Sequence, residues 1–161
     1  MHTHSGPIVV GLISDTHGLL RPSVHQALEG VQIILHSGDV GGQEILDELS
    51  IIAPVHAVYG NTDPPDDPSL KEAVVLQLGG VSIHVSHGHE VGSPTPAKLL
   101  DAYREQVLIY GHTHKPLVAK VDERLVINPG AAGPRRFNLV PSVARMTIDE
   151  GTVEVEIVPL A

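Results

Sequence analysis

The chain has 161 residues, no cysteine and a formal charge of −9, so disulfide bonds, thiolate metal sites and a cysteine nucleophile are excluded. The acidic balance argues against a strong nucleic-acid surface, which needs a basic patch. Apolar residues make up 42% and charged residues 18%, which indicates one folded domain over residues 7–161 after a short flexible leader, residues 1–6. Without a bilayer-length apolar stretch or a signal-type sequence, a cytoplasmic protein is expected.

Strand and helix patterns alternate over the first third of the chain. Apolar runs rich in β-branched residues predict buried strands at residues 7–14, 31–35 and 55–59. Amphipathic stretches between them predict helices at residues 21–29 and 42–49. This β-α-β-α-β order predicts a parallel sheet.

The remainder of the chain reads as hairpins with one further helix. Residues 61–68 form a loop dense in Pro and Asp, and Gly79-Gly80 is a turn signal between strands at 73–78 and 81–86. A helix at 96–103 precedes a strand at 107–110, and two hairpins follow, with strands at 117–121, 125–128, 143–148 and 152–158. We expect an α/β fold with two packed sheets and helices outside, a four-layer α/β/β/α sandwich.

Short motifs with nitrogen and oxygen donors recur at similar intervals, most of them at the end of an apolar run. They are Asp15-Thr16-His17, Gly38-Asp39, Gly60-Asn61, His87-Gly88 and Gly111-His112-Thr113-His114. Each alone is more often a turn, a cap or an ordinary loop histidine. Together, at strand ends that can meet in one crevice, they are hard to obtain by chance. The set predicts a site for two divalent cations, and its donors suit Mn, Fe, Zn or Ni.

The spacing of the donors indicates how two ions would be held. Two ions need a shared anionic bridge, and Asp39 is the best candidate because a carboxylate can give one oxygen to each. Asp15 and His17 lie two residues apart, so in an extended segment both side chains point the same way, which suits one ion. His112 and His114 have the same spacing and can each serve a different ion. Further donors are the amide oxygen of Asn61 and the imidazole of His87.

The motif order D-x-H, G-D, G-N-x-D, H-G, G-H-x-H, N-P-G resembles the calcineurin-like metallophosphoesterase superfamily, and within it the YfcE-type phosphodiesterases of bacteria and archaea. The resemblance covers nearly the whole chain and implies the metallophosphoesterase sandwich of two mixed sheets. Carried over by position, it implies a first ion on Asp15, His17, Asp39 and His114, and a second on Asp39, Asn61, His87 and His112. It also implies that a hydroxide bridging the two ions, Mn²⁺ being favoured, attacks phosphorus in line with the departing alkoxide.

The chain departs from the family at positions that bear on the substrate. Protein serine/threonine phosphatases of the superfamily have a leaving-group histidine where this chain has Thr62. Because Thr62 cannot act as that acid, small phosphodiesters with good leaving groups, nucleotide-derived ones included, are favoured. Ala131 follows Asn128-Pro129-Gly130, where the family often has serine and thus one more polar contact.

Residues outside the ligand set are assigned individually. Arg135 and Arg136 are candidate contacts for a substrate phosphate; the alternative is a solvated surface pair, which is favoured more for Arg136 than for Arg135. The candidate catalytic residues are His17, Asp39, Asn61 and His89. Of these, His89 either shapes the pocket or aids the leaving group. Two roles are equally expected for Asp63: it orients a neighbouring group, or it is a solvated carboxylate. A buried, satisfied position is expected for His36, and structural or surface positions for His25, His56 and His84.

Three functions fit the motifs, of which a metal-dependent phosphodiesterase acting on small phosphodiesters ranks first. A phosphomonoesterase with the same dinuclear site is the second. The third is a non-catalytic scaffold like the retromer subunit of this fold, which has lost key ligands. His17, together with the full ligand set, favours an enzyme. No membrane partner is expected, and the oligomeric state, a homo-oligomer included, stays open.

Overall fold

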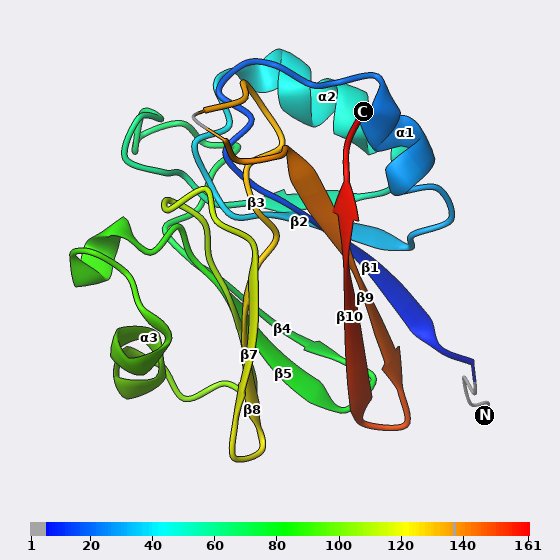
Figure 1. The fold of residues 1–161 in the computed structure, drawn as a ribbon, viewed down its shortest axis with the longest axis vertical. Coiled ribbons are helices and arrows are strands. Elements are labelled where there is room, and N and C mark those ends of the chain that lie inside the picture. Colours follow the sequence, from blue (N-terminus) through cyan, green and yellow to red (C-terminus); the bar gives the residue numbers. More distant parts are fainter. Residues whose placement is uncertain (1–5, 137) are drawn as a thin grey trace.

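The computed structural model describes residues 6–136 and 138–161, which form two five-stranded sheets and a few short helices (Figure 1). The first sheet has the order β10-β9-β1-β2-β3, with β1 (Ile8–Ile13), β2 (Ile33–His36), β3 (Val55–Ala57), β9 (Ser142–Asp149) and β10 (Thr152–Pro159). The second has the order β4-β5-β6-β8-β7, with β4 (Val74–Leu78), β5 (Val81–Val85), β6 (Val107–Ile109), β7 (Leu117–Val121) and β8 (Arg124–Asn128). The helices are α1 (Ser23–Ala27), α2 (Gln43–Ile52), α3 (Pro96–Ala102) and the 3-10 turn η1 (His89–Val91). Of the predicted leader, only Gly6 falls within the described residues.

Both sheets are mixed, with parallel strands at their centres. In the first sheet β1, β2 and β3 are parallel, while β9 and β10 extend the sheet as antiparallel strands. In the second, β5, β6 and β8 are parallel, and β4 and β7 flank them as antiparallel strands. The parallel order predicted for the first three strands is confirmed. Every predicted metal-ligand motif therefore follows the carboxyl end of a parallel strand.

Three apolar clusters fill the spaces between four layers, and strand alternation explains the division. In β1, Ile13 faces the helices α1 and α2, where it joins a cluster with Leu28 and Leu49. Its neighbour Leu12 faces the other sheet and belongs to the cluster between the sheets. On the far side, Leu99 of α3 joins a third cluster on the outer face of the second sheet. The predicted α/β/β/α sandwich is thus confirmed.

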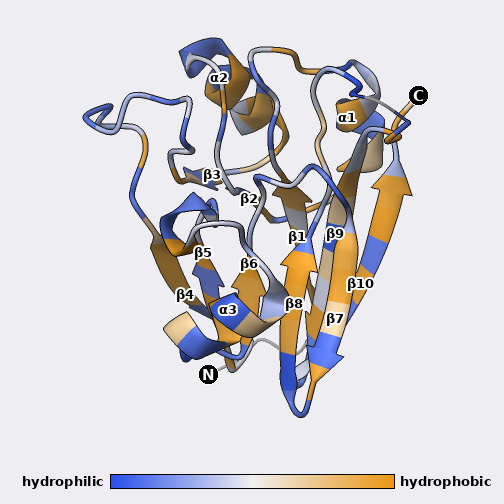
Figure 2. Cartoon of the chain, turned by 60° about the vertical axis from the view of Figure 1, so that its left-hand side comes forward, coloured by the Kyte–Doolittle hydropathy of each residue, from blue (hydrophilic) through white to orange (hydrophobic). Residues whose placement is uncertain are grey.

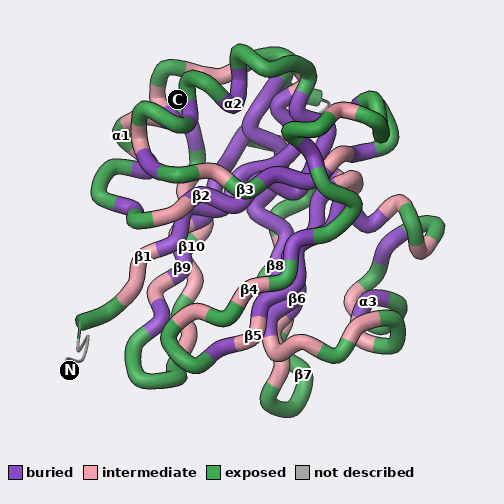
Figure 3. The backbone as a smooth tube through the Cα atoms, turned by 180° about the vertical axis from the view of Figure 1, so that it is seen from behind, coloured by how far each residue is buried: buried purple, intermediate pink, exposed green. Residues whose placement is uncertain are grey.

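The views of hydropathy and burial agree with this division. Figure 2 shows apolar residues concentrated along the strands and polar residues in the connecting loops. Figure 3 shows the strands of the interior buried, while the hairpin tips and helix surfaces are exposed. None of the helices that the structure describes is long and apolar enough to cross a membrane.

Most predicted elements are present, with shifted ends. α1 is shorter than the helix predicted over residues 21–29, because the chain turns away at Gly30, whose φ is 83°. α2 runs three residues beyond the predicted end, as far as Ile52, and Pro54 then prevents its continuation. β3 is shorter than predicted over residues 55–59, because beyond Ala57 only the isolated bridge from Val58 to Lys71 continues the pairing.

Candidate metal centre

The parallel strands of both sheets deliver the predicted ligands to one shared edge. Asp15 and His17 follow β1, Asp39 follows β2 and Asn61 follows β3, while His87 follows β5 and the two histidines of the Gly-His-Thr-His motif follow β6. The glycines in these motifs allow the loops to approach one another. A Cβ on Gly60 would collide with the carboxylate of Asp39, and one on Gly38 would lie 2.6 Å from Nδ1 of His87. Replacing either glycine would therefore displace a candidate ligand.

The candidate ligands also have an uncommon backbone conformation. Of the seven non-glycine residues with positive φ in the described chain, five are predicted ligands: Asp15 (53°), His17 (47°), Asp39 (55°), His112 (74°) and His114 (67°). Each such conformation costs on the order of 1–3 kcal/mol, and such strain gathers at functional sites. Our assumption of an extended segment between Asp15 and His17 is therefore wrong. Left-handed turns, held by main-chain bonds such as His17 N to Asp39 O at 2.9 Å, bring the ligand side chains together instead.

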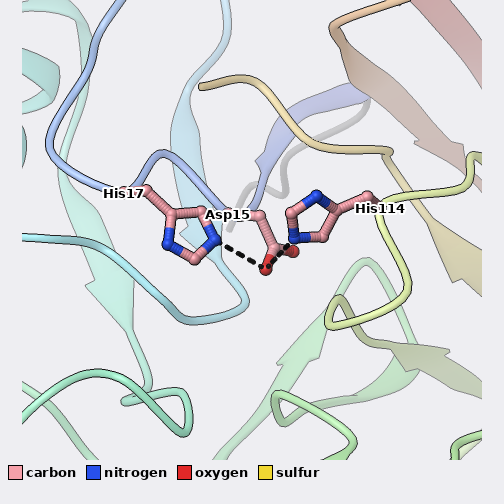
Figure 4. A group of neighbouring side chains, drawn as sticks. All are labelled: Asp15, His17 and His114. Atoms are coloured by element: carbon pink, nitrogen blue, oxygen red, sulfur yellow. Dashed lines mark ion pairs between the residues drawn. The ribbon is translucent and has the colours of Figure 1, made fainter. Parts of the chain in front are cut away.

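One group of side chains centres on Asp15 (Figure 4). Its Oδ1 atom lies 3.4 Å from Nε2 of His114 and 3.6 Å from Nε2 of His17. Its other oxygen, Oδ2, accepts hydrogen bonds from the Ser14 hydroxyl at 2.7 Å and the His112 amide at 3.1 Å, which fix the carboxylate. Oδ1 of Asp15 and Nε2 of His17 are both buried and have no hydrogen-bond partner among the described residues. Such unpaired, facing donor atoms are what a cation would satisfy.

The charge of Asp15 supports the same interpretation. Burial alone would raise the pKa of its carboxyl group, but the imidazoles of His114, His17 and His87 and the bond from Ser14 outweigh burial and hold the pKa well below its ordinary value. Asp15 is therefore a carboxylate at neutral pH, although its side chain is fully buried.

A second group centres on His87, whose Nδ1 donates to the carbonyl of Ser37 at 2.8 Å. That bond directs Nε2 into the site, where it lies 3.0 Å from Oδ1 of Asn61 and 3.3 Å from Nδ1 of His112. Burial would lower the pKa of His87, but the carboxylates of Asp39 and Asp15 and the bond to the Ser37 carbonyl together raise it. Burial and the neighbouring His87 lower the pKa of His112. The nitrogen and oxygen atoms that converge here, Nε2 of His87, Nδ1 of His112 and Oδ1 of Asn61, are all atoms that can ligate a metal ion.

Asp39 lies between the two groups. Its Oδ2 atom is 3.7 Å from Nε2 of His17 and 3.3 Å from Nε2 of His87. Its Oδ1 atom instead accepts two hydrogen bonds from Thr62, one from the amide and one from the hydroxyl. The geometry therefore contradicts our expectation that each oxygen serves one ion, because Oδ2 alone faces both groups. Burial would raise the pKa of Asp39, but His87 and Thr62 lower it to about 2.

Two predicted neighbours hold the ligand loops in place. Asp63 accepts main-chain hydrogen bonds from Val40 at 2.9 Å, Gly41 at 3.1 Å and Gly60 at 3.0 Å. Of its two readings, the orienting one is thus confirmed, since this carboxylate joins the loops that follow β2 and β3. His36 is buried and satisfied, as predicted, by bonds to the Gly38 amide at 3.1 Å and the Thr16 hydroxyl at 3.0 Å.

The sequence did not indicate the partners of the candidate ligands. Ser14 and Thr62 each bond one carboxylate; Ser14 lies outside the motifs, and the motif position of Thr62 did not indicate its bond to Asp39. Asn128 donates to the Gly111 carbonyl at 3.2 Å and the Thr113 hydroxyl at 3.0 Å, which ties the end of β8 to the Gly-His-Thr-His loop. Its place in an Asn-Pro-Gly motif was the one available signal.

The remaining candidates lie around this centre. The His89 ring, on η1, has its centroid 5.4 Å from that of His87 and 6.4 Å from that of His112, so it borders the second group. Arg135 is exposed and lines a narrow hollow with His114. Structural or surface positions are confirmed for the last three histidines: His25 pairs with Glu48, His56 is exposed on β3, and His84 stacks on Tyr103.

Comparison with known proteins agrees with the fold and the motifs. The model of the calcineurin-like phosphoesterase superfamily domain matches residues 8–151. The chain therefore belongs to the calcineurin-like phosphoesterase superfamily, as its motifs indicated.

Individual relatives are similar over most of their lengths. The chain is 34% identical over 173 residues to a protein of Methanocaldococcus jannaschii named "Probable metallophosphoesterase", covering 99% of this chain and 88% of that one. It is 29% identical over 139 residues to a phosphodiesterase of the same organism, covering 75% and 82%. Among solved structures, Vps29 of Entamoeba histolytica in complex with Zn²⁺ is similar with a TM-score of 0.75 and 29% identity, covering 94% of this chain and 99% of that one.

Proposed function

We propose that the protein is a metal-dependent phosphodiesterase that hydrolyses small phosphodiesters, nucleotide-derived ones included. The observation that carries the proposal is the pair of buried carboxylates: Oδ1 of Asp15 is unpaired among imidazoles, and Oδ2 of Asp39 faces both ligand groups. Membership of the superfamily and similarity to a phosphodiesterase support it.

Two overlapping sets of side chains would hold the ions. The first set is Asp15, His17, Asp39 and His114, and the second is Asp39, Asn61, His87 and His112. When bound, two divalent cations supply charge neutralisation at the phosphoryl oxygens and lower the pKa of a water that attacks phosphorus. Mn²⁺ is our first choice, and the same donors suit Fe, Zn or Ni.

Residues around the site keep the carboxylate ligands charged and hold the ligand side chains in position. The low pKa values of Asp15 and Asp39 keep both carboxylates charged at neutral pH. The bond from His87 to the Ser37 carbonyl fixes the ring so that Nε2 points into the site. Because Asp63 binds three main-chain amides, the loops that carry Asp39 and Asn61 keep their separation. A preorganised site needs little rearrangement to bind a phosphoryl group.

Thr62 favours diesters over phosphoproteins. Its hydroxyl donates to Asp39 at 2.8 Å and is not available as an acid for the leaving group. Diesters with good leaving groups demand little of a general acid. His89, beside His87 and His112, is our candidate for assisting poorer leaving groups.

A second candidate function is that of a protein-binding scaffold, favoured by the likeness to Vps29 structures. The candidate ligand set is complete, His17 included, which favours hydrolysis over binding alone. A scaffold would show no turnover with any divalent ion.

The test compares bis(p-nitrophenyl) phosphate with p-nitrophenyl phosphate in the presence of Mn²⁺. We expect the diester to be the better substrate and Asp39→Asn to lower its hydrolysis at least roughly 100-fold. A faster monoester reaction would establish the phosphomonoesterase alternative. Hydrolysis of neither compound, with the ions shown to be bound, would support the scaffold.

A further inference from the structure

A cavity of about 180 Å³ opens beside the candidate metal ligands, and it combines charged and apolar walls. It is lined by His112, Thr113, His114, Lys115, Arg136 and Leu139. The two imidazoles border the proposed ions, Lys115 and Arg136 supply positive charge, and Leu139 supplies an apolar surface. No acidic residue is among these described lining residues, although the whole chain carries a net charge of −9.

The two cationic side chains of the cavity have no structural bonds of their own. Lys115 and Arg136 are exposed, and neither side chain forms an ion pair or hydrogen bond with a described residue. Three other arginines differ, since they donate to main-chain carbonyls and so stabilise the fold: Arg21, Arg124 and Arg145. The charges at the cavity are therefore free for a ligand.

One wall of the cavity, residues 112–115, is held by the contacts that also hold the Gly-His-Thr-His loop. The Thr113 hydroxyl accepts hydrogen bonds from the side chain of Asn128 at 3.0 Å and from the Lys115 amide at 3.3 Å. On the opposite wall, the Leu139 amide donates a hydrogen bond to the Arg136 carbonyl at 3.1 Å. The wall that carries Lys115 is thus tied to the end of β8 through Asn128.

The charge and position of these walls limit what the cavity can bind. The negative charge of the phosphoryl group under attack would already be neutralised by the ions. The positive charges of Lys115 and Arg136 are therefore not needed for that group. Unpaired cations at the rim of an acidic protein attract an anion, and an arginine suits a phosphate especially well. We propose that the preferred substrate carries a second phosphate on the part that enters this cavity, with its carbon skeleton against Leu139. This inference rests on the proposed function, because it assumes that the scissile phosphate binds at the metal centre.

The test uses two diesters that differ by one phosphate: the p-nitrophenyl ester of thymidine 5′-monophosphate and the same ester with a phosphate on the 3′ hydroxyl. We expect kcat/KM to be roughly three- to tenfold higher for the bisphosphate compound, as for a partly exposed charged contact. Arg136→Gln and Lys115→Gln should each lower this ratio toward one and leave kcat/KM for the monophosphate compound within about twofold of wild type.

Two further variants make the comparison specific. Arg104→Gln removes the same charge from the exposed residue before β6, at the opposite end of that strand from His112 and His114, and should preserve the ratio. Arg135→Gln removes the charge next to Arg136 but outside the cavity lining, and should lower the ratio less than Arg136→Gln does. An equal loss in the Arg104 variant would overturn the proposal.

Calorimetric titration with the two products, in the presence of Mn²⁺, gives a readout independent of turnover. Thymidine 3′,5′-bisphosphate should bind more tightly than thymidine 5′-monophosphate in the wild type, and Arg136→Gln should remove the difference. If neither diester is hydrolysed but this difference is found, the proposed function fails while the phosphate-binding cavity stands. Equal affinities, together with equal kcat/KM values wherever hydrolysis occurs, would overturn the inference.

Discussion

Thr62 donates both its main-chain amide, at 2.9 Å, and its hydroxyl, at 2.8 Å, to Oδ1 of Asp39. These bonds leave Oδ2 as the oxygen that faces His17 and His87. We infer that Thr62 positions the shared carboxylate, at the place where phosphatases of the superfamily have a histidine for the leaving group.

Removing the Thr62 hydroxyl should loosen Asp39 without removing a ligand. Thr62→Ala should lower kcat for diester hydrolysis and the affinity for Mn²⁺ about tenfold each, because Oδ1 of Asp39 then keeps only the bond from the amide and the carboxylate is held less firmly. Thr62→Ser keeps the hydroxyl and should behave like the wild type. Calorimetric Mn²⁺ titration and steady-state kinetics measure the two effects. A serine variant as impaired as the alanine variant would show that the hydroxyl is not the responsible group.

The stability of the protein should depend on the protonation of His36. Its Nδ1 accepts from the Gly38 amide, and its Nε2 donates to Thr16, so a second proton on the ring breaks the bond to Gly38. Burial lowers the pKa of His36 from 6.5 to about 4. The unfolded chain therefore binds the proton first as the pH falls. Stability from neutral His36 is full above about pH 6.5 and is lost progressively toward pH 4, by about 3 kcal/mol in total.

Urea unfolding of the wild type and His36→Gln at a series of pH values measures this contribution. The free energy of unfolding of the wild type should fall more steeply than that of the variant between pH 6.5 and pH 4. Carboxylates that titrate in the same range affect both proteins, so the difference between the curves isolates His36. Parallel curves would mean that His36 is not the group responsible.

The effect of replacing His89 should depend on the leaving group. If its ring assists the departing alkoxide, His89→Asn should slow hydrolysis of a diester that releases phenol at least about tenfold more than one that releases p-nitrophenol. If the ring only shapes the pocket, both reactions should slow equally. Rates for the two diesters, measured at the same Mn²⁺ concentration, separate these outcomes.

The fold could be predicted because its determinants are local. The buried strands end in ligand motifs, and the glycine pair at residues 79–80 sets a hairpin between β4 and β5. The ends of α1 and α2 were less predictable, since they depend on where Gly30 and Pro54 allow the chain to turn.

The candidate site could be predicted in its residues but not in its geometry. Asp15 and His17 were paired on the assumption of an extended segment, whereas both have positive φ values that only the packing of adjacent loops can impose. The different roles of the two Asp39 oxygens, one bonded to Thr62 and the other facing both ligand groups, likewise depend on tertiary contacts. The sequence is the same whether the hydroxyl of a threonine is free or hydrogen-bonded, so the bond from Thr62 could not be predicted.

The most direct test of a two-ion diesterase is the hydrolysis of bis(p-nitrophenyl) phosphate at increasing ratios of Mn²⁺ to metal-free protein. The shared position of Asp39 predicts that activity appears as the second ion binds and is complete at two ions per chain, with Asp39→Asn inactive throughout. Full activity at one ion per chain would contradict the dinuclear site, and two tightly bound ions without any hydrolysis would contradict the enzyme.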